Sequence, residues 1–267
     1  IYSTTENRIA LSMLYYCEKK ILDFFNIRKD SKNKKIIDSF DEYLEKKQKT
    51  LGFTLSSEQQ KAVELINSGE KTLFLIGYAG TGKSTSSRAI LELLEEIASY
   101  DDIIAIALSG IASQRISDTT GYNASTIQSL LVKHKEKDFF PYKVILLDEA
   151  SMVNSVTFAQ IISKISDDTI FIIVGDDGQL PAIGAGNILA DSIKYELAPI
   201  CKLTKIYRQN ENQAIAVIAN DIRKGELPNY KEEYEDFKFV DVSIGNYYSM
   251  KNSLTQNEFS DMRGENS

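Results

Sequence analysis

The sequence predicts an α/β fold: a mainly parallel β-sheet with helices on both faces, preceded by a small helical module. From about residue 51, short apolar runs typical of buried strands alternate with segments whose apolar residues recur at helical spacing. This alternation is typical of a parallel sheet covered by helices. In addition, the apolar run 72–76 leads into a glycine-rich stretch and then into a helical pattern. That order is expected where a strand, a tight loop and a helix follow one another.

The first 50 residues are predicted to form the helical module. Their apolar residues recur at helical spacing in two places, around 9–25 and around 36–44. The basic segment 29–35 joins these two helices. A run of lysines is usually a solvated surface, and a contact with DNA is the alternative that the sequence leaves open.

The α/β domain is predicted to span residues 51–203. Its expected strands are 71–76, 103–108, 143–147 and 169–174, and its expected helices are 57–68, 83–99, 110–118, 155–165 and 188–195. The carboxyl ends of parallel strands meet at one edge of a sheet, so the loops that follow these strands are expected to form a shared ligand site. Residues 243–267 are rich in Ser, Asn and Gly, which predicts a linker or a disordered tail.

Composition favours a soluble globular protein without a membrane partner. The chain has 267 residues, of which 43% are hydrophobic and 26% charged, enough for a sizeable core. It contains no apolar run of the roughly 18 residues needed to span a membrane, and no signal-peptide pattern. Cys17 and Cys201 lack metal-type spacing, so reduced thiols in a cytoplasmic protein are expected. The net charge of −7 disfavours an architectural, charge-driven DNA binder but allows binding in a local groove.

The glycine-rich stretch GYAGTGKST, residues 77–85, fits G-x-x-x-x-G-K-[ST], a loop whose backbone N–H groups cradle nucleotide phosphates. Lys83 is expected to reach the β- and γ-phosphates, and the Ser84 hydroxyl to ligate Mg²⁺. The start of the following helix adds its positive dipole end. The residues expected to bind the nucleotide are Gly77, Gly80, Thr81, Gly82, Lys83, Ser84 and Thr85.

Acidic and amide side chains follow two later strands. Asp148 and Glu149 end the apolar run 144–147; Asp148 is expected to hold Mg²⁺, and Glu149 to orient and deprotonate an attacking water. The alternative is that this pair only caps the next helix. Gln179, in a turn after the run 169–174, is expected to sense the γ-phosphate, although turn chemistry alone also explains the Gly, Asp and Pro around it. Together these features predict a nucleoside triphosphatase core.

Six segments in order also resemble a known family. They are LSSEQQKAV (55–63), GYAGTGKST (77–85), TIQSLL (126–131), LLDEASMV (146–153), VGDDGQLPAIGAGNIL (174–189) and YRQNEN (207–212). Over about residues 50–230 the chain resembles the first half of a RecD-like superfamily 1 helicase, similar to the exodeoxyribonuclease V alpha subunit. The resemblance implies a RecA-like P-loop fold and ATP-driven 5′ to 3′ movement on single-stranded DNA, in DNA repair or recombination. It also implies that residues 204–242 begin a second motor domain, most of which is not recognised in this sequence.

The resemblance implies further site residues. Gln60 would read the adenine edge, Tyr207 would stack on the adenine, and Arg208 would reach the γ-phosphate. The residues implied to touch the single strand are Ser109, Gly110, Thr126, Gln128 and Ser129. Without the resemblance, Tyr207 could equally be an ordinary core residue, and Arg208 could be paired with a carboxylate.

The sequence departs from the family pattern at three places. Tyr78-Ala79 stands where relatives often have Gly-Pro, Ile111 where an arginine is usual, and Gln128 where histidine is frequent. The last two departures bear on the DNA contacts and leave the nucleotide chemistry untouched. The single histidine, His134, lies in a polar stretch and is predicted to be a surface residue rather than a ligand.

Three functions follow in order of preference. The first is a DNA helicase or translocase driven by ATP hydrolysis. The second is an ATP-gated subunit that docks on a nuclease or recombination partner and does not itself unwind DNA. The third is a P-loop ATPase without a nucleic-acid partner, which is disfavoured because Gln60, Gln179 and Tyr207-Arg208 have no reason to occur together in a generic ATPase.

Overall fold

The computed structural model describes residues 2–3, 9–205, 218–219, 221–222 and 225–227. Residues 1–208 belong to one compact unit and residues 209–267 to another. In the second unit, residues 218–219 and 221–222 are helical. Tyr207, Arg208 and the predicted tail 243–267 lie outside the described residues, and the predicted domain boundaries stay predictions.

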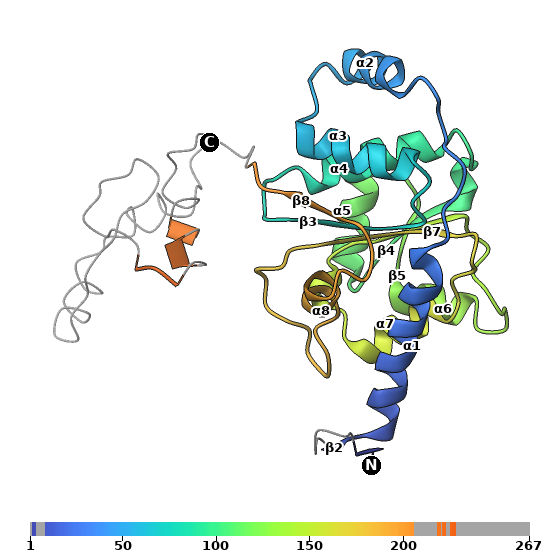
Figure 1. Ribbon diagram of the computed structural model, residues 1–267, viewed down its shortest axis with the longest axis vertical. Helices are drawn as coiled ribbons and strands as arrows, with labels where there is room; N and C mark the ends of the chain where they lie inside the picture. The colour runs from blue at the N-terminus through green and yellow to red at the C-terminus, as the bar shows by residue number, and fades with distance from the viewer. Residues whose placement is uncertain (1, 4–8, 206–217, 220, 223–224, 228–267) are drawn as a thin grey trace, which may run out of the picture. The chain divides into compact units, whose positions relative to one another are not determined.

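A parallel sheet forms the centre of the first unit (Figure 1). Its six strands have the order β5-β4-β6-β7-β3-β8, and every neighbouring pair is parallel. The strands are β3 (Thr72–Gly77), β4 (Ile103–Ala107), β5 (Ala124–Thr126), β6 (Val144–Leu147), β7 (Ile170–Gly175) and β8 (Ile200–Leu203). Strand β7 therefore lies between β3, which leads into the glycine-rich loop, and β6, which leads into the acidic pair.

Helices cover both faces of the sheet (Figure 1). One face carries α3 (Ser57–Asn67), α4 (Lys83–Leu94) and α5 (Gly110–Thr120), with α2 (Phe40–Leu51) packed against α3. The other carries α1 (Ser12–Lys29), α6 (Ile127–Lys133), α7 (Ser155–Ile162) and α8 (Ile188–Lys194). Short 3₁₀ helices, η1 (Tyr100–Asp102) and η2 (Ala150–Met152), and a hairpin of β1 (Tyr2–Ser3) and β2 (Ile9–Ala10) complete the described elements. The predicted fold class is confirmed.

Strand β3 shows why helices must cover both faces of the sheet. Its residues alternate between two cores: Leu73 and Leu75 pack under α3 and α4, whereas Phe74 and Ile76 pack against α1 and α7. All four are almost fully buried. A strand buried on both faces reads as a continuous apolar run, which is why its position was predictable.

Several element boundaries differ from the sequence prediction. Helix α4 ends at Leu94 rather than at residue 99, because the chain tightens there into turns in which the N–H groups of Glu96 and Ile97 bond carbonyls three residues back. Helix α2 begins only at Phe40, because Asn67 hydrogen-bonds the backbone of Ile37 and holds it outside the helix. The elements that were not predicted are β5, β8 and α6, together with η1, η2 and the pair β1 and β2.

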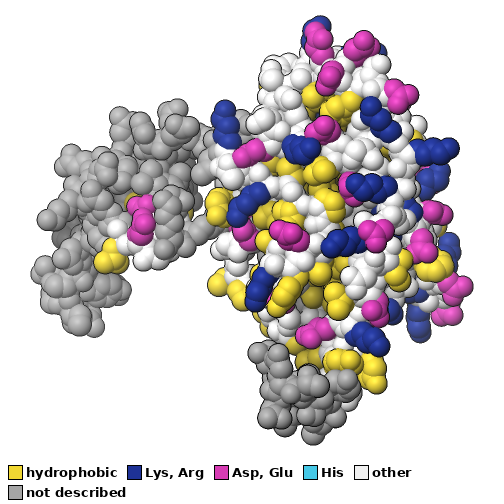
Figure 2. Space-filling model, viewed as in Figure 1, with side chains coloured by type: hydrophobic (Ala, Val, Ile, Leu, Met, Phe, Trp, Pro, Cys, Tyr) yellow, Lys and Arg dark blue, Asp and Glu magenta, His cyan; other side chains and the backbone are white. Residues whose placement is uncertain are grey.

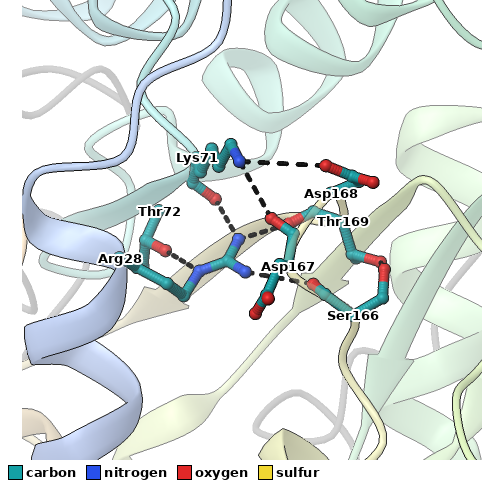
Figure 3. Close-up of polar contacts among 7 residues, drawn as sticks. All are labelled: Arg28, Lys71, Thr72, Ser166, Asp167, Asp168 and Thr169. Atoms are coloured by element: carbon teal, nitrogen blue, oxygen red, sulfur yellow. Dashed lines mark hydrogen bonds and ion pairs between the residues drawn. The ribbon is translucent and has the colours of Figure 1, made fainter.

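Arg28 fastens α1 to the sheet (Figure 3). Its guanidinium donates to the carbonyls of Lys71 (2.9 Å), Ser166 (3.1 Å) and Thr169, and to the Thr72 hydroxyl (2.9 Å). Burial lowers the Arg28 pKa to about 10, although nearby aspartates oppose this effect. These contacts lie at the start of β3 and β7, so α1 is joined to the edge of the sheet opposite the glycine-rich loop.

None of the helices in the described part of the chain is both long and apolar enough to cross a membrane.

Candidate functional site

The glycine-rich loop between β3 and α4 has backbone conformations that require glycine. Gly80 and Gly82 both have φ of +85°, in the left-handed region. At Gly77, a Cβ would lie 2.4 Å from the Thr81 hydroxyl oxygen and 2.9 Å from the Leu203 carbonyl oxygen. The Lys83 ammonium donates to the carbonyls of Gly77 (2.6 Å) and Tyr78 (3.0 Å), so its side chain arches back over the loop.

A cavity of about 380 Å³ lies beside this loop. It brings together segments that follow three strands, together with one face of α5, as expected at the carboxyl edge of a parallel sheet. Its lining consists of Tyr78, Ala79, Gly80, Gly82, Lys83, Ser84, Thr85, Arg115, Ile116, Thr119, Asp148, Glu149 and Gln179. Most of the predicted phosphate-binding residues, the acidic pair and Gln179 therefore share one cavity.

The acidic pair occupies the end of β6. Burial raises the pKa of Asp148; the Glu149 carboxylate adds to the rise, whereas Lys83 and Arg115 oppose it. Glu149 has φ of +53°, which is unusual for a residue with a side chain and costs on the order of 1–2 kcal/mol. Strained backbone of this kind is frequent at functional sites, where it holds a side chain in a particular direction.

Gln179 reaches the cavity from the loop after β7. Because β7 lies between β3 and β6, this loop emerges between the glycine-rich loop and the acidic pair. The Ser151 hydroxyl donates to the Gln179 amide oxygen at 3.2 Å. Asp176 is buried and accepts from the Gly178 N–H at 2.9 Å, which shapes the turn before Gln179.

The two adjacent glutamines of α3 point in different directions. The Gln59 side chain accepts from the Ser56 N–H (2.9 Å) and its amide nitrogen lies 3.5 Å from the carbonyl oxygen of Gly82 in the glycine-rich loop. The Gln60 amide instead donates to the Leu55 carbonyl at 2.7 Å. Gln60, predicted to read the adenine, thus bonds within its own segment, whereas Gln59 contacts the glycine-rich loop.

Four of the five residues predicted to touch a single strand lie close together. Ala107 of β4 pairs in register with Thr126 of β5, so the two strands end side by side. Ser109 caps α5, which starts at Gly110; Thr126 caps α6 and hydrogen-bonds the Ser129 hydroxyl at 2.9 Å. The fifth, Gln128, lines a separate hollow of about 280 Å³ between α6 and α7.

Sequence reasoning missed Arg115 and Ser151. Arg115 lies one helical turn after Ile111, which is 85% exposed and stands where an arginine is usual in the family. Positions four residues apart share a helix face, so this spacing was the available signal for Arg115. The contact of Ser151 with Gln179 joins loops 28 residues apart and had no sequence signal.

The prediction that His134 is a surface residue is wrong. Its side chain is 5% exposed and packs edge-on against Phe140 and Tyr142. Burial lowers the pKa of His134, and nearby lysines lower it further. The aromatic residues beyond the polar stretch fold back over the imidazole, which a local pattern does not show.

The charged surface is mixed. Figure 2 shows Lys and Arg side chains interleaved with Asp and Glu over the visible face of the described residues. Within the described part of the chain, no group of three or more His, Cys, Asp or Glu side chains is arranged to hold a metal ion. A divalent cation at the cavity would therefore take most of its ligands from elsewhere, such as phosphate oxygens and water.

A glycine-rich phosphate loop between a parallel strand and a helix, with an Asp-Glu pair two strands away, defines a P-loop NTPase domain. The chain belongs to the family described as AAA domain, whose model matches residues 54–243. This family assignment and the fold confirm the predicted P-loop NTPase domain, and the relatives described next support the resemblance to RecD-like superfamily 1 motor domains.

Several proteins are similar to this chain. It is 30% identical over 185 residues to the ATP-dependent RecD2 DNA helicase of Deinococcus radiodurans, covering 67% of this chain and 25% of the relative. It is 27% identical to the RecBCD enzyme subunit RecD of Mycolicibacterium smegmatis, covering 65% and 37%. It is 29% identical to the ATP-dependent DNA helicase dda of Enterobacteria phage T4, covering 67% and 45%. The chain thus spans between a quarter and just under half of the length of these relatives.

Among solved structures, Bacteroides Pif1 bound to ssDNA aligns over 66% of this chain and 47% of its own length. The TM-score is 0.48 and the sequence identity is 24%.

Proposed function

We propose that this chain carries the ATP-hydrolysing motor domain of a DNA helicase that moves along single-stranded DNA. The observation that carries the proposal is the single cavity shared by Lys83, Ser84, Asp148, Glu149 and Gln179. These residues come from three loops, and they combine a phosphate cradle, an acidic pair and a polar side chain able to follow the terminal phosphate.

The phosphates would bind at the glycine-rich loop. Backbone N–H groups at the start of α4 point toward an anion there, and the helix dipole favours negative charge. A triphosphate would draw the Lys83 ammonium from the carbonyls of Gly77 and Tyr78 onto its own oxygens. Gln59, which lies against Gly82, is the better placed of the two glutamines to serve the nucleotide site.

The Ser84 hydroxyl and the Asp148 carboxylate fit a bound Mg²⁺. Both are hard oxygen ligands, and Mg²⁺ prefers one or two such protein ligands together with phosphate oxygens and water. Asp148 is half-buried beside a second carboxylate, so a cation would relieve the cost of its charge. The ion would supply charge neutralisation at the phosphates.

Glu149 would orient the attacking water and accept its proton. Its left-handed backbone and its place in the cavity lining put a carboxylate beside the expected position of the terminal phosphate. Gln179, held by the Ser151 hydroxyl, would respond to the presence of that phosphate.

DNA would bind across the ends of β4 and β5. Ser109, Gly110, Thr126 and Ser129 offer hydroxyl and backbone groups of the kind that contact a sugar-phosphate chain without reading bases. The similar proteins from Deinococcus radiodurans and phage T4 are named as ATP-dependent DNA helicases, which supports this choice of partner.

The second candidate is an ATP-gated subunit of a nuclease or recombination complex that does not itself unwind DNA. It is favoured by one observation: the similarity to a protein named as a RecBCD enzyme subunit. A chain of this kind would bind ATP in the same cavity, but its hydrolysis would not respond to single-stranded DNA.

The proposed chemistry is tested by two substitutions. Lys83→Ala is expected to abolish ATP binding, because it removes the charge that meets the phosphates. Glu149→Gln is expected to retain ATP affinity and to lower hydrolysis by at least about 100-fold, because an amide cannot accept the proton. Titration calorimetry measures the binding, and phosphate release measures the turnover.

The controls are Lys46→Ala and Glu42→Gln, two exposed positions on α2 away from the cavity. Both should behave as the unmodified chain. Hydrolysis that persists in Glu149→Gln would contradict the general-base assignment. Stimulation by single-stranded DNA supports the motor, and its absence with ATP still bound supports the gated subunit.

A further inference from the structure

Arg115 lines the cavity, and the nucleotide chemistry proposed above does not use it. It lies on α5, where Arg115, Ile116 and Thr119 face the glycine-rich loop and the acidic pair. The cavity therefore holds two cationic side chains, Lys83 and Arg115, against two carboxylates, Asp148 and Glu149.

The contacts of Arg115 differ from those of other described arginines. Arg28 makes four hydrogen bonds, and Arg88 forms an ion pair with Glu92 at 2.8 Å. The side chain of Arg115 is exposed, and the described residues provide its guanidinium with neither a hydrogen bond nor an ion pair. A guanidinium without a hydrogen bond or ion pair among the described residues thus lines the same cavity as the acidic pair.

The chemistry of this group suits a phosphate. Guanidinium is planar, always charged and presents donors in a fork that matches phosphate oxygens. Lys83 and the start of α4 already serve the loop side of the cavity. Arg115 instead lines the cavity from α5, and Asp148 and Glu149 line the same cavity from the end of β6. The terminal phosphate must lie beside Glu149 for that residue to activate water.

We propose that Arg115 binds the terminal phosphate of the nucleotide and makes the site selective for triphosphate over diphosphate. This inference rests on the proposed function, since it requires a nucleotide in the cavity. It adds a cationic contact from within the first motor domain. The proposal also suggests how the nucleotide site and the DNA site are coupled. Helix α5 begins at Gly110, about 8 Å from Arg115 at 1.5 Å rise per residue, so one rigid helix would touch both the phosphate and the DNA.

The alternative role for Arg115 is electrostatic support of the acidic pair. The two roles predict different binding behaviour. A contact with the terminal phosphate acts only on a nucleotide that has one. A supporting role for Asp148 and Glu149 acts on ATP and ADP alike.

The test compares the affinity for ADP with that for the non-hydrolysable β,γ-imido analogue of ATP, in the presence of Mg²⁺. Arg115→Ala is expected to weaken the analogue by about tenfold or more, the loss of a charge-assisted hydrogen bond, and to leave ADP within about twofold. Arg115→Lys should recover part of the loss, because it keeps the charge but not the fork. The matched control is Arg88→Ala, which removes an exposed arginine of α4 outside the cavity and should change neither affinity.

The ratio of the two affinities decides the outcome. Equal weakening of both nucleotides by Arg115→Ala, or no weakening of either, would overturn the proposal. Retained ADP binding shows that the variant is folded. If Arg115→Ala binds neither nucleotide, Arg115→Lys is measured instead. A ratio of analogue affinity to ADP affinity that is unchanged in Arg115→Lys overturns the proposal. An unmodified chain that binds neither nucleotide would overturn the proposed function itself, an outcome distinct from the failure of Arg115 alone.

Discussion

At the scale of single residues, the direction of the side chain gives different contacts to neighbours that look equivalent in the sequence. Gln59 and Gln60 are adjacent, yet Gln59 is 4% exposed and contacts Gly82, whereas Gln60 bonds back to Leu55. The cause is a capping box: Ser56 and Gln59 satisfy each other's backbone N–H groups, which turns the Gln59 side chain toward the start of α3. The S-x-x-Q spacing was therefore a usable signal for Gln59.

We expect Gln59→Ala to weaken ATP binding by about tenfold, because it removes the side chain that meets the glycine-rich loop. Gln60→Ala serves as the matched control and should change ATP affinity by less than about twofold. Titration with ATP and GTP checks both. If Gln60→Ala alone weakens ATP relative to GTP, the original assignment of the adenine contact to Gln60 is correct and the geometric argument fails.

At the scale of elements, the loop 177–187 is held against the start of α7. The Ser155 N–H donates to the Ala185 carbonyl (2.9 Å), and the Asn154 amide donates to the Ile183 carbonyl (3.1 Å). Gly186 has φ of +87°, and a Cβ there would lie 1.8 Å from the Ser155 hydroxyl oxygen. This close approach positions the loop that carries Gln179.

Gly186→Ala is expected to lower the free energy of unfolding by about 2–3 kcal/mol, from left-handed strain plus the clash with buried Ser155. It should also reduce ATP hydrolysis, because Gln179 is carried by the same loop. Gly121→Ala is the matched control: its φ is +82° but no atom lies within 4 Å of the added Cβ, so only about 1 kcal/mol of strain is expected. Urea unfolding measures both, and equal losses would show that the close approach contributes nothing.

The positions of strands were predictable where a strand carries its own pattern of apolar residues. Strands β3, β4, β6 and β7 are buried throughout and consist almost entirely of apolar residues, so their positions followed from the sequence. Strand β5 has only three residues, all half-buried, and β8 has a mixed pattern of buried and exposed residues. Both form because β4 and β3 offer free hydrogen-bonding edges, which no local pattern reports.

At the scale of the whole molecule, the N-terminal helix and the sheet are fastened at the edge opposite the cavity. Arg28 joins α1 to the start of β3, 43 positions further along the chain, and to the segment before β7, about 140 positions further along. Phe25 of the same helix is buried against Phe74 and Phe158. Helix α1 is thus part of the core beneath the sheet, while the nucleotide residues remain at the far edge.

Arg28→Ala is expected to lower the free energy of unfolding by about 3 kcal/mol, because it removes a buried side chain together with its four hydrogen bonds. In the folded fraction, nucleotide affinity should be unchanged, since the cavity lies at the other edge of the sheet. Urea unfolding followed by circular dichroism, with Lys19→Ala on the exposed side of α1 as control, checks the stability. A loss below about 1 kcal/mol would contradict the fastening role.

The sequence by itself determined the phosphate loop, the acidic pair, four central strands and the family of the domain, because each depends on a short stretch of chain with its own pattern of glycine, charge or apolar residues. Only the tertiary structure decided the place of β7 between β3 and β6, the burial of His134, the contact of Gln59 with Gly82 and the presence of Arg115 in the cavity. These features depend on contacts that no short sequence pattern reports, and the free energy of such contacts is set by packing and by side-chain direction in three dimensions.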